Sequence, residues 1–307
     1  MRAISFPAFD QPAALTDLPV PEPGPGEVLV EVHASSLNGF DLGVLGGHLK
    51  GVFAYEFPVV LGRDFAGVVA ELGAGVDHFT VGQAVFGVVL RPTLGQGGFA
   101  EYVAVPADQG IAPIPAGLDP QLAAALGLAG TAAHDAVDAV APTEGETVLV
   151  VGATGGVGGY ATQLAAARGA AVIATARPGA EAAFVTAHGA THTVDPDGDL
   201  AAQVRALAPA GVHAALHLAG DGAAVAGLVA AGGRFASTLH HVPAEASDIE
   251  ATAVLADPSP ATLAALAEAV VAGRLRVPLG RRYPLAEVPQ ALAEFGAGTL
   301  GKVGVTV

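Results

Sequence analysis

The sequence contains no cysteine and no tryptophan, and only one methionine. Without cysteine the chain forms no disulfide, no thiolate zinc site and no iron–sulfur cluster, and it has no cysteine nucleophile. A chain without disulfides fits a cytoplasmic location, which we expect here. The first residues also lack the charged start, apolar block and cleavage site of a signal peptide.

Positive charge is scarce as well. Lysine and arginine number 13 against 29 acidic residues, which gives a formal net charge of −16. Nucleic acids and anionic membranes are bound by side chains that neutralise phosphates, so this balance argues against both as partners. No apolar run reaches the ~18 residues of a membrane span. We therefore expect a small molecule as the partner.

The sequence changes character near Pro120. Residues 1 to about 118 hold many short β-branched runs separated by glycine and proline, which predicts a small barrel or sandwich. Beyond them strands alternate with helices, which predicts a parallel sheet with helices on its faces. A final strand is expected over 301–307. The expected helices cover residues 120–141, 156–168, 181–188, 200–208, 222–231 and 260–275.

The stretch "TVLVVGATGGVGG" joins an apolar strand to a helix through a cluster of glycines that includes Gly152, Gly155 and Gly158. Glycine lets the backbone approach a pyrophosphate closely, and the first N–H groups and the dipole of the helix attract an anion. A tight packing turn would need glycines too. The alternation of strand and helix that follows favours a dinucleotide site.

The end of the second strand of this alternation indicates which dinucleotide binds. A protein that selects NAD usually has a carboxylate there for the ribose 2′-hydroxyl. This chain instead has Thr175, Ala176 and Arg177, and its first acid is Glu181 in the next helix. Arg177 is suited to pair with a 2′-phosphate, and Thr175 to add a hydroxyl. The alternative is an arginine on a solvated helix start. We expect NADPH as the cofactor.

Motifs along the whole chain resemble the zinc-independent quinone oxidoreductases of the medium-chain dehydrogenase/reductase superfamily. The opening "PEPGPGEVLVEVHASSLNGFD" holds the family's Asn-x-x-Asp at Asn38 and Asp41. The glycine turn is similar to the family's cofactor turn. Three further motifs are similar to the family's own: "GQGGFAEYVAVPA", "LAGTAAHDAV" and "LGKVGVTV".

This resemblance implies an α/β fold with a GroES-like β-barrel catalytic domain and a Rossmann doubly wound parallel sheet. The catalytic domain is expected over residues 1–120 and 259–307, and the Rossmann domain over 121–258. A homodimer is expected. The implied cofactor-binding residues are Asp41, Thr131, Gly152, Thr154, Gly155, Gly156, Val157, Gly158, Thr175, Arg177, Ala219, Ser237 and Lys302.

The positions that bind zinc in metal-dependent relatives carry other residues here. Asn38 stands where they have the first zinc cysteine, and Gly62-Arg63-Asp64 replaces their Gly-His-Glu. An arginine does not ligate zinc, so we expect no metal. Oxidation of a simple alcohol needs a Lewis acid, whereas reduction of a quinone or an α,β-unsaturated carbonyl needs only a hydrogen-bond donor for the developing oxyanion.

Three side chains are candidate catalytic donors, namely Asn38, Tyr55 and Arg63. Asn38 is the first choice, and Asp41 is expected to orient its loop. Tyr55 is either at the edge of the pocket or a core-edge tyrosine, and Arg63 is either a donor or the partner of a nearby acid. His240 and His241, after the fifth Rossmann strand, are either solvated loop residues or substrate contacts.

The chain departs from the resemblance at two places, with Pro196 near an expected tyrosine and "STLHHVPAEAS" in place of a glycine-rich segment. Both changes bear on the identity of the substrate and on how tightly the cofactor binds. Three functions follow as alternatives. The chain is an NADPH-dependent reductase of quinones or enones, a discrete enoyl reductase that tailors a polyketide-type intermediate, or a non-catalytic NADPH-binding protein.

Overall fold

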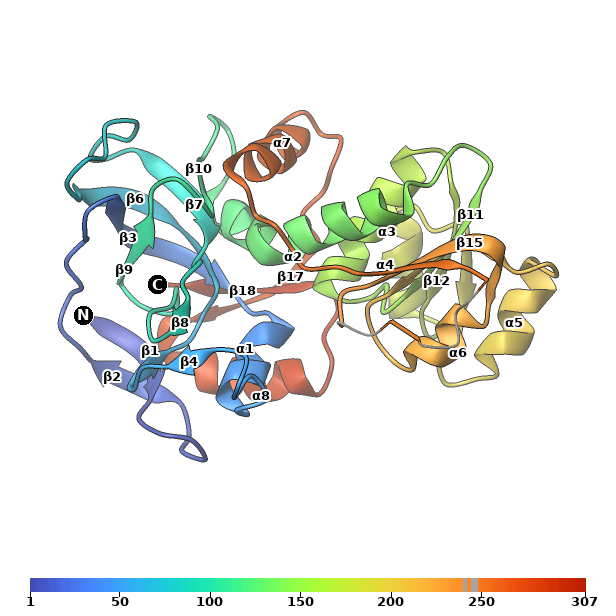
Figure 1. The fold of residues 1–307 in the computed structure, drawn as a ribbon, viewed down its shortest axis with the longest axis horizontal. Coiled ribbons are helices and arrows are strands. Elements are labelled where there is room, and N and C mark those ends of the chain that lie inside the picture. The colour runs from blue at the N-terminus through green and yellow to red at the C-terminus, as the bar shows by residue number, and fades with distance from the viewer. Residues whose placement is uncertain (240–241, 244–247) are drawn as a thin grey trace. The chain divides into compact units, whose positions relative to one another are not determined.

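The protein is described from a computed structural model, which covers residues 1–239, 242–243 and 248–307. The chain forms two compact units. The first unit comprises Met1–Leu128 and Pro258–Val307, and the second comprises Ala129–Asp257. Figure 1 shows the elements of both. Among the described residues, no helix combines the length and the apolarity needed to cross a membrane.

The first unit is rich in strands. Its sheets have the orders β2-β1-β5, β4-β8 and β10-β7-β6-β3-β18-β17, with β9 also paired to β3. The strands are β1 (Arg2–Phe6), β2 (Ala14–Asp17), β3 (Glu27–Ser36), β4 (Ala54–Tyr55), β5 (Val59–Val60), β6 (Asp64–Leu72), β7 (Ala84–Val88), β8 (Thr93–Leu94), β9 (Tyr102–Pro106), β10 (Ile111–Pro113), β17 (Leu279–Pro284) and β18 (Lys302–Thr306). Its helices are α1 (Gly39–Leu45), α7 (Pro260–Val271), the short η1 (Leu285–Glu287) and α8 (Val288–Gly296).

The register of the central strands brings distant residues together. β3 is antiparallel to both β6 and β18, with Ala34 opposite Ala66 and Ser36 opposite Gly304. The end of β3 therefore lies beside the first residues of β6 and β18. Those first residues are Asp64 and Lys302, so one sheet edge collects Ser36, an acid and a lysine.

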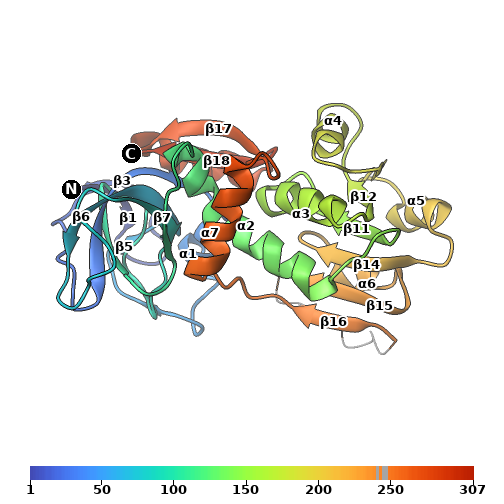
Figure 2. The ribbon, with the colours of Figure 1, turned by 90° about the horizontal axis from the view of Figure 1, so that it is seen from above.

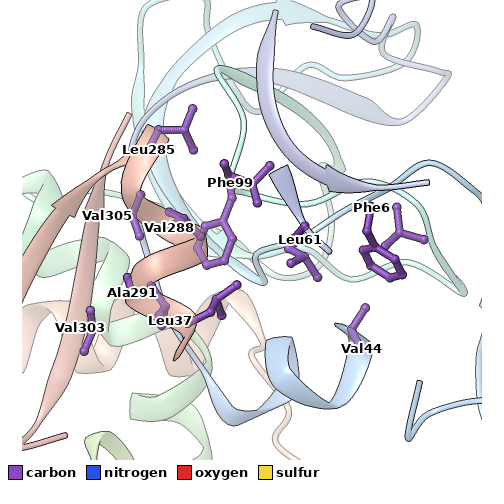
Figure 3. Packing of buried hydrophobic residues seen from close by; sticks show 14 of the residues in the cluster. Phe6, Leu37, Val44, Leu61, Phe99, Leu285, Val288, Ala291, Val303 and Val305 are labelled. Atoms are coloured by element: carbon purple, nitrogen blue, oxygen red, sulfur yellow. The ribbon is translucent and has the colours of Figure 1, made fainter. Parts of the chain in front are cut away.

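A buried apolar cluster supports this edge. Figure 3 shows side chains from α8 and β18 gathered around Phe99 together with Leu37 and Leu61. Phe99, Leu37 and Leu61 are at most 2% exposed. Burial of such side chains contributes roughly 1.5–3 kcal/mol each, which fixes the chain on both sides of Asn38 and Asp64.

Helix α2 (Pro120–Val140) matches the helix expected over 120–141. We expected a domain boundary at residue 120, where α2 begins, but the first unit extends to Leu128. The reason is a buried contact, since the N–H of Leu128 donates to Oδ1 of Asp64 at 2.8 Å.

The second unit is a six-stranded parallel sheet with the order β13-β12-β11-β14-β15-β16. The strands are β11 (Thr147–Val151), β12 (Ala171–Thr175), β13 (His192–Val194), β14 (Val212–His217), β15 (Val229–Ser237) and β16 (Glu250–Ala253). The helices are α3 (Gly156–Ala167), α4 (Ala180–Ala187), α5 (Leu200–Leu207) and α6 (Gly222–Ala226). Figure 2 shows β14, β15 and β16 side by side in this sheet.

The sequence predicted the alternation of this unit, with one clear error. The helix expected over 222–231 ends at Ala226, and Gly227 caps it. Val229 already belongs to β15, where it pairs with Val212. Pairing with a buried parallel strand thus overrides the helical tendency of the alanines that follow.

Candidate functional site

The glycine turn lies between β11 and α3 at the reversal point of the parallel sheet. The neighbours of β11 are β12 on one side and β14 on the other, so successive crossovers leave in opposite directions. Ligands of such sheets bind at the carboxyl ends of the strands beside this point. The sheet therefore predicts a ligand next to Gly152.

Two glycines give this turn its shape. Gly152 has a φ of 88°, which favours glycine, and a Cβ on Gly158 would overlap the carbonyl oxygen of Gly152. The N-cap of α3, Gly155, has no side chain, so it does not cap the first N–H groups of the helix. Turn and helix form a cradle that fits a pyrophosphate. The expected residues Thr154, Gly155, Gly156 and Val157 are all partly exposed there.

Thr175 has a different role from the one expected. Its Oγ1 accepts the N–H of Gly152 at 2.9 Å and lies 3.4 Å from the carbonyl oxygen of Val150, to which it donates. The residue is buried. Its hydroxyl therefore fixes the glycine turn instead of being available to a nucleotide.

Arg177 is held by two carboxylates. Its Nε lies 2.6 Å and its Nη2 3.3 Å from the oxygens of Asp197, and its Nη1 lies 2.9 Å from Oε1 of Glu181. The hydrogen bonds that Arg177 donates to Asp197 and Glu181 raise the pKa of the guanidinium above its ordinary value. The expected phosphate partner is thus an exposed cation that already has two acidic partners, neither of which was predicted.

Three other expected cofactor residues lie at defined places in the second unit. Ala219 follows β14, and a Cβ on Gly152 would touch it at 3.0 Å. Oγ of Ser237 lies 2.9 Å from Nδ1 of His217, whose Nε2 lies 3.1 Å from the carbonyl oxygen of Gly220. His217 was not predicted, and it ties the ends of β14 and β15 together. Thr131 is buried within α2.

The first unit contains a buried polar network around Asp64. Its carboxylate accepts hydrogen bonds from Ser36 Oγ, from Asn38 Nδ2 at 2.8 Å and from the N–H of Leu128 at 2.8 Å. A Cβ at position 127 would meet Oδ1 of Asp64, so Gly127 gives the carboxylate its space. Asp64 is 0% exposed. No role was expected for Ser36, and Asp64 was considered only as a possible partner of Arg63.

Lys302 is the cation of this network. Its Nζ donates to the carbonyl oxygen of Leu37 at 2.8 Å and to Oδ1 of Asn38 at 2.7 Å, and lies 3.3 Å from Asp64. Burial lowers the pKa of the lysine, and the carboxylates of Asp64 and Asp41 oppose that effect. Lys302 is 2% exposed. Its three acceptors hold it inside this network, and its expected contact with the cofactor stays a prediction.

Asn38 is fully engaged by its neighbours. Nδ2 donates to Asp64 and, at 3.3 Å, to the carbonyl oxygen of Ser36, while Oδ1 accepts from Lys302. An amide has two N–H donors, and both are used here. Asn38 was our first choice as the catalytic donor, and its hydrogen bonds instead make it a bridge between Asp64 and Lys302.

Asp41 supports the same loop, as expected, from the first turn of α1. Its Oδ2 accepts the backbone N–H of Asn38 at 2.8 Å. Burial raises the pKa of its carboxyl from 3.8 to about 7, the hydrogen bond from Asn38 opposes the rise, and the charge of Asp64 adds to it. Asp41 is buried, so it acts on the loop of Asn38.

Arg63 differs from Lys302 because one nitrogen of its guanidinium has no hydrogen-bond partner in the part of the chain that the structure describes. This nitrogen, Nε, is buried. Its guanidinium carbon lies 4.5 Å from the centre of the Phe40 ring. Burial lowers the pKa of Arg63, while Asp41 and Asp64 act in the opposite direction. Arg63 is therefore a cation with donors left to offer.

A small cavity lies beside Arg63. It has a volume of about 10 Å³, which is the size of one water molecule. Its polar lining comes from Arg63, Asp41 and Gln96, and the remaining wall is formed by backbone and apolar residues. A water at this place would have acceptor and donor groups within one site.

Tyr55 is a core-edge tyrosine. Its hydroxyl donates to the carbonyl oxygen of Val44 at 3.3 Å. Its ring lies 4.8 Å from that of Phe9 and stacks on Phe57 at 6.0 Å between ring centres. Of the two alternatives that the sequence left open, these contacts favour the structural one.

The described residues contain no group of three or more histidine, cysteine, aspartate or glutamate side chains arranged to hold a metal ion. In particular, Asp64 is bound by Ser36, Asn38 and Lys302. His240 and His241, the candidate substrate contacts, lie outside the described residues.

Comparison with known proteins identifies the family. Residues 24–116 match the family described as "Alcohol dehydrogenase GroES-like domain", and residues 156–239 match "Zinc-binding dehydrogenase". The quinone oxidoreductase of Coxiella burnetii has a similar structure, with a TM-score of 0.88 and 30% identity over 100% of this chain and 99% of that one. The predicted fold class, a GroES-like barrel with a Rossmann sheet, is confirmed.

Two further relatives bear on cofactor and substrate. A mycobacterial protein solved with NADPH has a TM-score of 0.86 and 28% identity, over 100% of this chain and 100% of its own length. A mycocerosic acid synthase-like polyketide synthase of Mycobacterium tuberculosis is 33% identical over 97% of this chain and 14% of its own. The chain spans about half the length of the first curated relatives it matches. The chain belongs to the medium-chain dehydrogenase/reductase superfamily, a family of pyridine-nucleotide-dependent oxidoreductases with quinone oxidoreductases among its members.

Proposed function

We propose that the protein is an NADPH-dependent, zinc-independent reductase of quinones or α,β-unsaturated carbonyls. The observation that carries this proposal is the pair of features found in the two units. One unit holds a pyrophosphate cradle at the reversal point of a parallel sheet. The other has a lysine, an asparagine and an arginine around the position where metal-dependent relatives place ligands.

The nucleotide part of the proposal rests on the second unit. Gly152 and Gly158 shape the turn, and the uncapped start of α3 offers N–H groups to a pyrophosphate. Arg177 directly follows Ala176 at the end of β12, where a 2′-phosphate distinguishes NADPH from NADH. NADPH, when bound, supplies the hydride that the reaction consumes.

The catalytic part rests on Arg63. Negative charge develops on the carbonyl oxygen of the acceptor during reduction, and a donor aimed at that oxygen lowers the barrier. The side chain of Asn38 has no free N–H, whereas Arg63 has an Nε without a hydrogen-bond partner among the described residues, and Asp41 and Asp64 favour its charged form. We therefore assign the donor role to Arg63, and to Asn38 and Lys302 the role of holding the loop before α1.

The functional test measures NADPH consumption with a panel of quinones and enones, before and after exhaustive treatment with a chelator. We expect turnover with at least one acceptor and no loss after chelation. Binding of NADPH without turnover of any acceptor would favour a non-catalytic role. Stoichiometric zinc in the active protein, or loss of activity with the chelator, would contradict the metal-free mechanism.

A matched pair of variants tests the donor. Arg63→Met keeps an apolar stem against Phe40 but removes every donor, and we expect kcat to fall about a hundredfold with NADPH affinity unchanged. Arg205→Met, on the exposed side of α5, is the control for loss of one positive charge. An Arg63→Met protein that keeps its full rate on all acceptors would show that another group stabilises the oxyanion.

The alternative of a discrete enoyl reductase is favoured by the similarity to the polyketide synthase, which spans nearly the whole of this chain. Enoyl thioesters in the same acceptor panel distinguish the two, because a preference for them over quinones would identify the tailoring enzyme. The homodimer and the cytoplasmic location stay predictions.

A further inference from the structure

The loops after β12 and β13 meet at one corner of the parallel sheet. The two strands pair in parallel register, with Thr175 opposite Val194, and the N–H of Ala176 continues the ladder to the carbonyl oxygen of Val194 at 2.9 Å. The residues that follow both strands are consequently neighbours. Arg177 comes from the first loop and Asp197 from the second.

Asp197 occupies the side of Arg177 that is best suited to a phosphate. Its carboxylate takes both Nε and Nη2, the two-pronged arrangement in which guanidinium groups bind carboxylates and phosphates most strongly. Glu181 takes Nη1. Three nitrogens of the cation are thus engaged, and the three charged groups together have a net charge of −1.

The two acids are held in different ways. Glu181 also accepts the backbone N–H of Arg177 at 2.8 Å, and its side chain is 27% exposed, so it belongs to the start of α4. Asp197 has a side chain that is 64% exposed, and the N–H of its own backbone donates to Oδ1 of Asp195. Asp197 is therefore the partner that a ligand displaces more easily.

We propose that Asp197 determines nucleotide specificity by competing with the 2′-phosphate of NADPH for Arg177, so that the chain discriminates only weakly between NADPH and NADH. The inference rests on the proposed function. A 2′-phosphate carries between one and two negative charges, and it must either displace the carboxylate of Asp197 or bind beside it. NADH has a hydroxyl at this position and meets no such competition.

The test uses Asp197→Asn, which keeps the size of the side chain and removes its charge. Equilibrium titration with NADPH and with NADH, without an acceptor, measures binding apart from catalysis. We expect NADPH to bind about three- to tenfold more tightly and NADH to change less than about twofold, because an exposed pair in water contributes modestly.

Glu144→Gln is the matched control. Glu144 is an exposed acid just before β11, at the amino edge of the same sheet, so this variant makes the same change in net charge away from the carboxyl ends of the strands. It should leave both affinities unchanged. The Asp197→Asn effect should also disappear in an Arg177→Met background, because the competition acts through that cation.

The outcomes separate this inference from the proposed function. A parent protein that binds neither nucleotide would overturn both. A parent that binds NADPH, with an affinity that Asp197→Asn leaves unchanged or weakens, would overturn the inference alone. An effect of equal size from Glu144→Gln, or one that persists without Arg177, would also overturn it, because the cause would then be general charge.

Discussion

The two units each hold a cation among carboxylates, but they do so under opposite conditions. In the first, Lys302 and Asp64 are 2% and 0% exposed. In the second, the side chains of Arg177 and Asp197 are 56% and 64% exposed. A buried charge that loses its partner has no water to replace it, whereas an exposed charge is solvated at once.

This difference in burial indicates that the two clusters have different roles. The buried network also satisfies the amide of Asn38, the hydroxyl of Ser36 and the N–H of Leu128, so it joins β3, β6, α2 and β18. The exposed cluster joins the loops after β12 and β13 and the start of α4. We infer that the first maintains the fold around the candidate donor Arg63 and that the second is able to exchange a protein partner for a ligand.

The largest expected effect comes from removing the buried acid. Asp64→Ala leaves Lys302 without its counter-charge and removes the acceptor of Ser36, Asn38 and Leu128. We expect a loss of about 3–5 kcal/mol in the free energy of unfolding, measured by urea denaturation. Asp197→Ala is the counterpart in the exposed cluster and should leave the urea midpoint nearly unchanged.

Asp64→Asn provides a second test if the alanine variant does not fold. It keeps the size and one acceptor oxygen, and it should destabilise the protein less than Asp64→Ala does. If Asp64→Asn and Asp197→Ala had the same small effect, the contrast between buried and exposed clusters would be wrong.

The second prediction concerns Asp41, which faces Asp64, Lys302, Arg63 and the backbone of Asn38. The pKa of Asp41 is about 7 in the folded chain, whereas the ordinary value of an aspartate is 3.8. Between these values the folded state binds a proton that the unfolded state has released, so this group makes stability fall as the pH rises from about 4 to about 7. Asp41→Asn should remove that fall in stability, which is on the order of a few kcal/mol, because an amide does not titrate in this pH range. Its amide oxygen can still accept the N–H of Asn38, so the loop keeps its support.

Urea denaturation at pH 5 and pH 8 measures this effect. Relative to the parent, the variant should gain more stability at the higher pH. A gain of equal size at both pH values would indicate that Asp41 keeps its ordinary pKa and that burial does not govern its charge.

Local signals in the sequence sufficed for the nucleotide unit. Gly152 and Gly158 lie within one strand–turn–helix segment, and this segment together with the strand–helix alternation that follows it predicted the cradle. Helix α3 was expected over 156–168 and is found over Gly156–Ala167. The error over 222–231 arose where strand pairing with Val212 decided the structure, and a single segment carries no signal of its partner strand.

The roles of individual side chains were harder to predict because their partners are far along the chain. Asn38 has the type and position of a donor, yet its partners Asp64 and Lys302 lie 26 and 264 residues away. Glu181 lies only four residues after Arg177, whereas Asp197 lies 20 residues after it and reaches it because β12 and β13 are neighbours. Sequence spacing reveals helical neighbours and not those brought together by a sheet.

The third prediction replaces the exposed cation, Arg177, by an acid. Arg177→Glu places three carboxylates where a 2′-phosphate is expected, so NADPH affinity should fall about tenfold or more, while NADH affinity changes less. Fluorescence titration of both nucleotides checks this, and the urea midpoint should stay close to that of the parent. Equal weakening of both nucleotides would place the effect outside the 2′ position.

The smallest expected effect is a difference in how the two clusters respond to ionic strength. Raising the ionic strength from about 0.01 M to about 1 M shortens the Debye length from about 30 Å to about 3 Å, which screens exposed charges far more than buried ones. The ratio of NADPH dissociation constants between the parent and Asp197→Asn should therefore approach one at high salt. The difference in unfolding free energy between the parent and Asp64→Asn should stay nearly constant over the same range, since water and ions do not reach Asp64. A parallel decline of both quantities would mean that solvent enters the Asp64–Lys302 network, and the loop that carries Asn38 would then lack the rigid support that we assign to it.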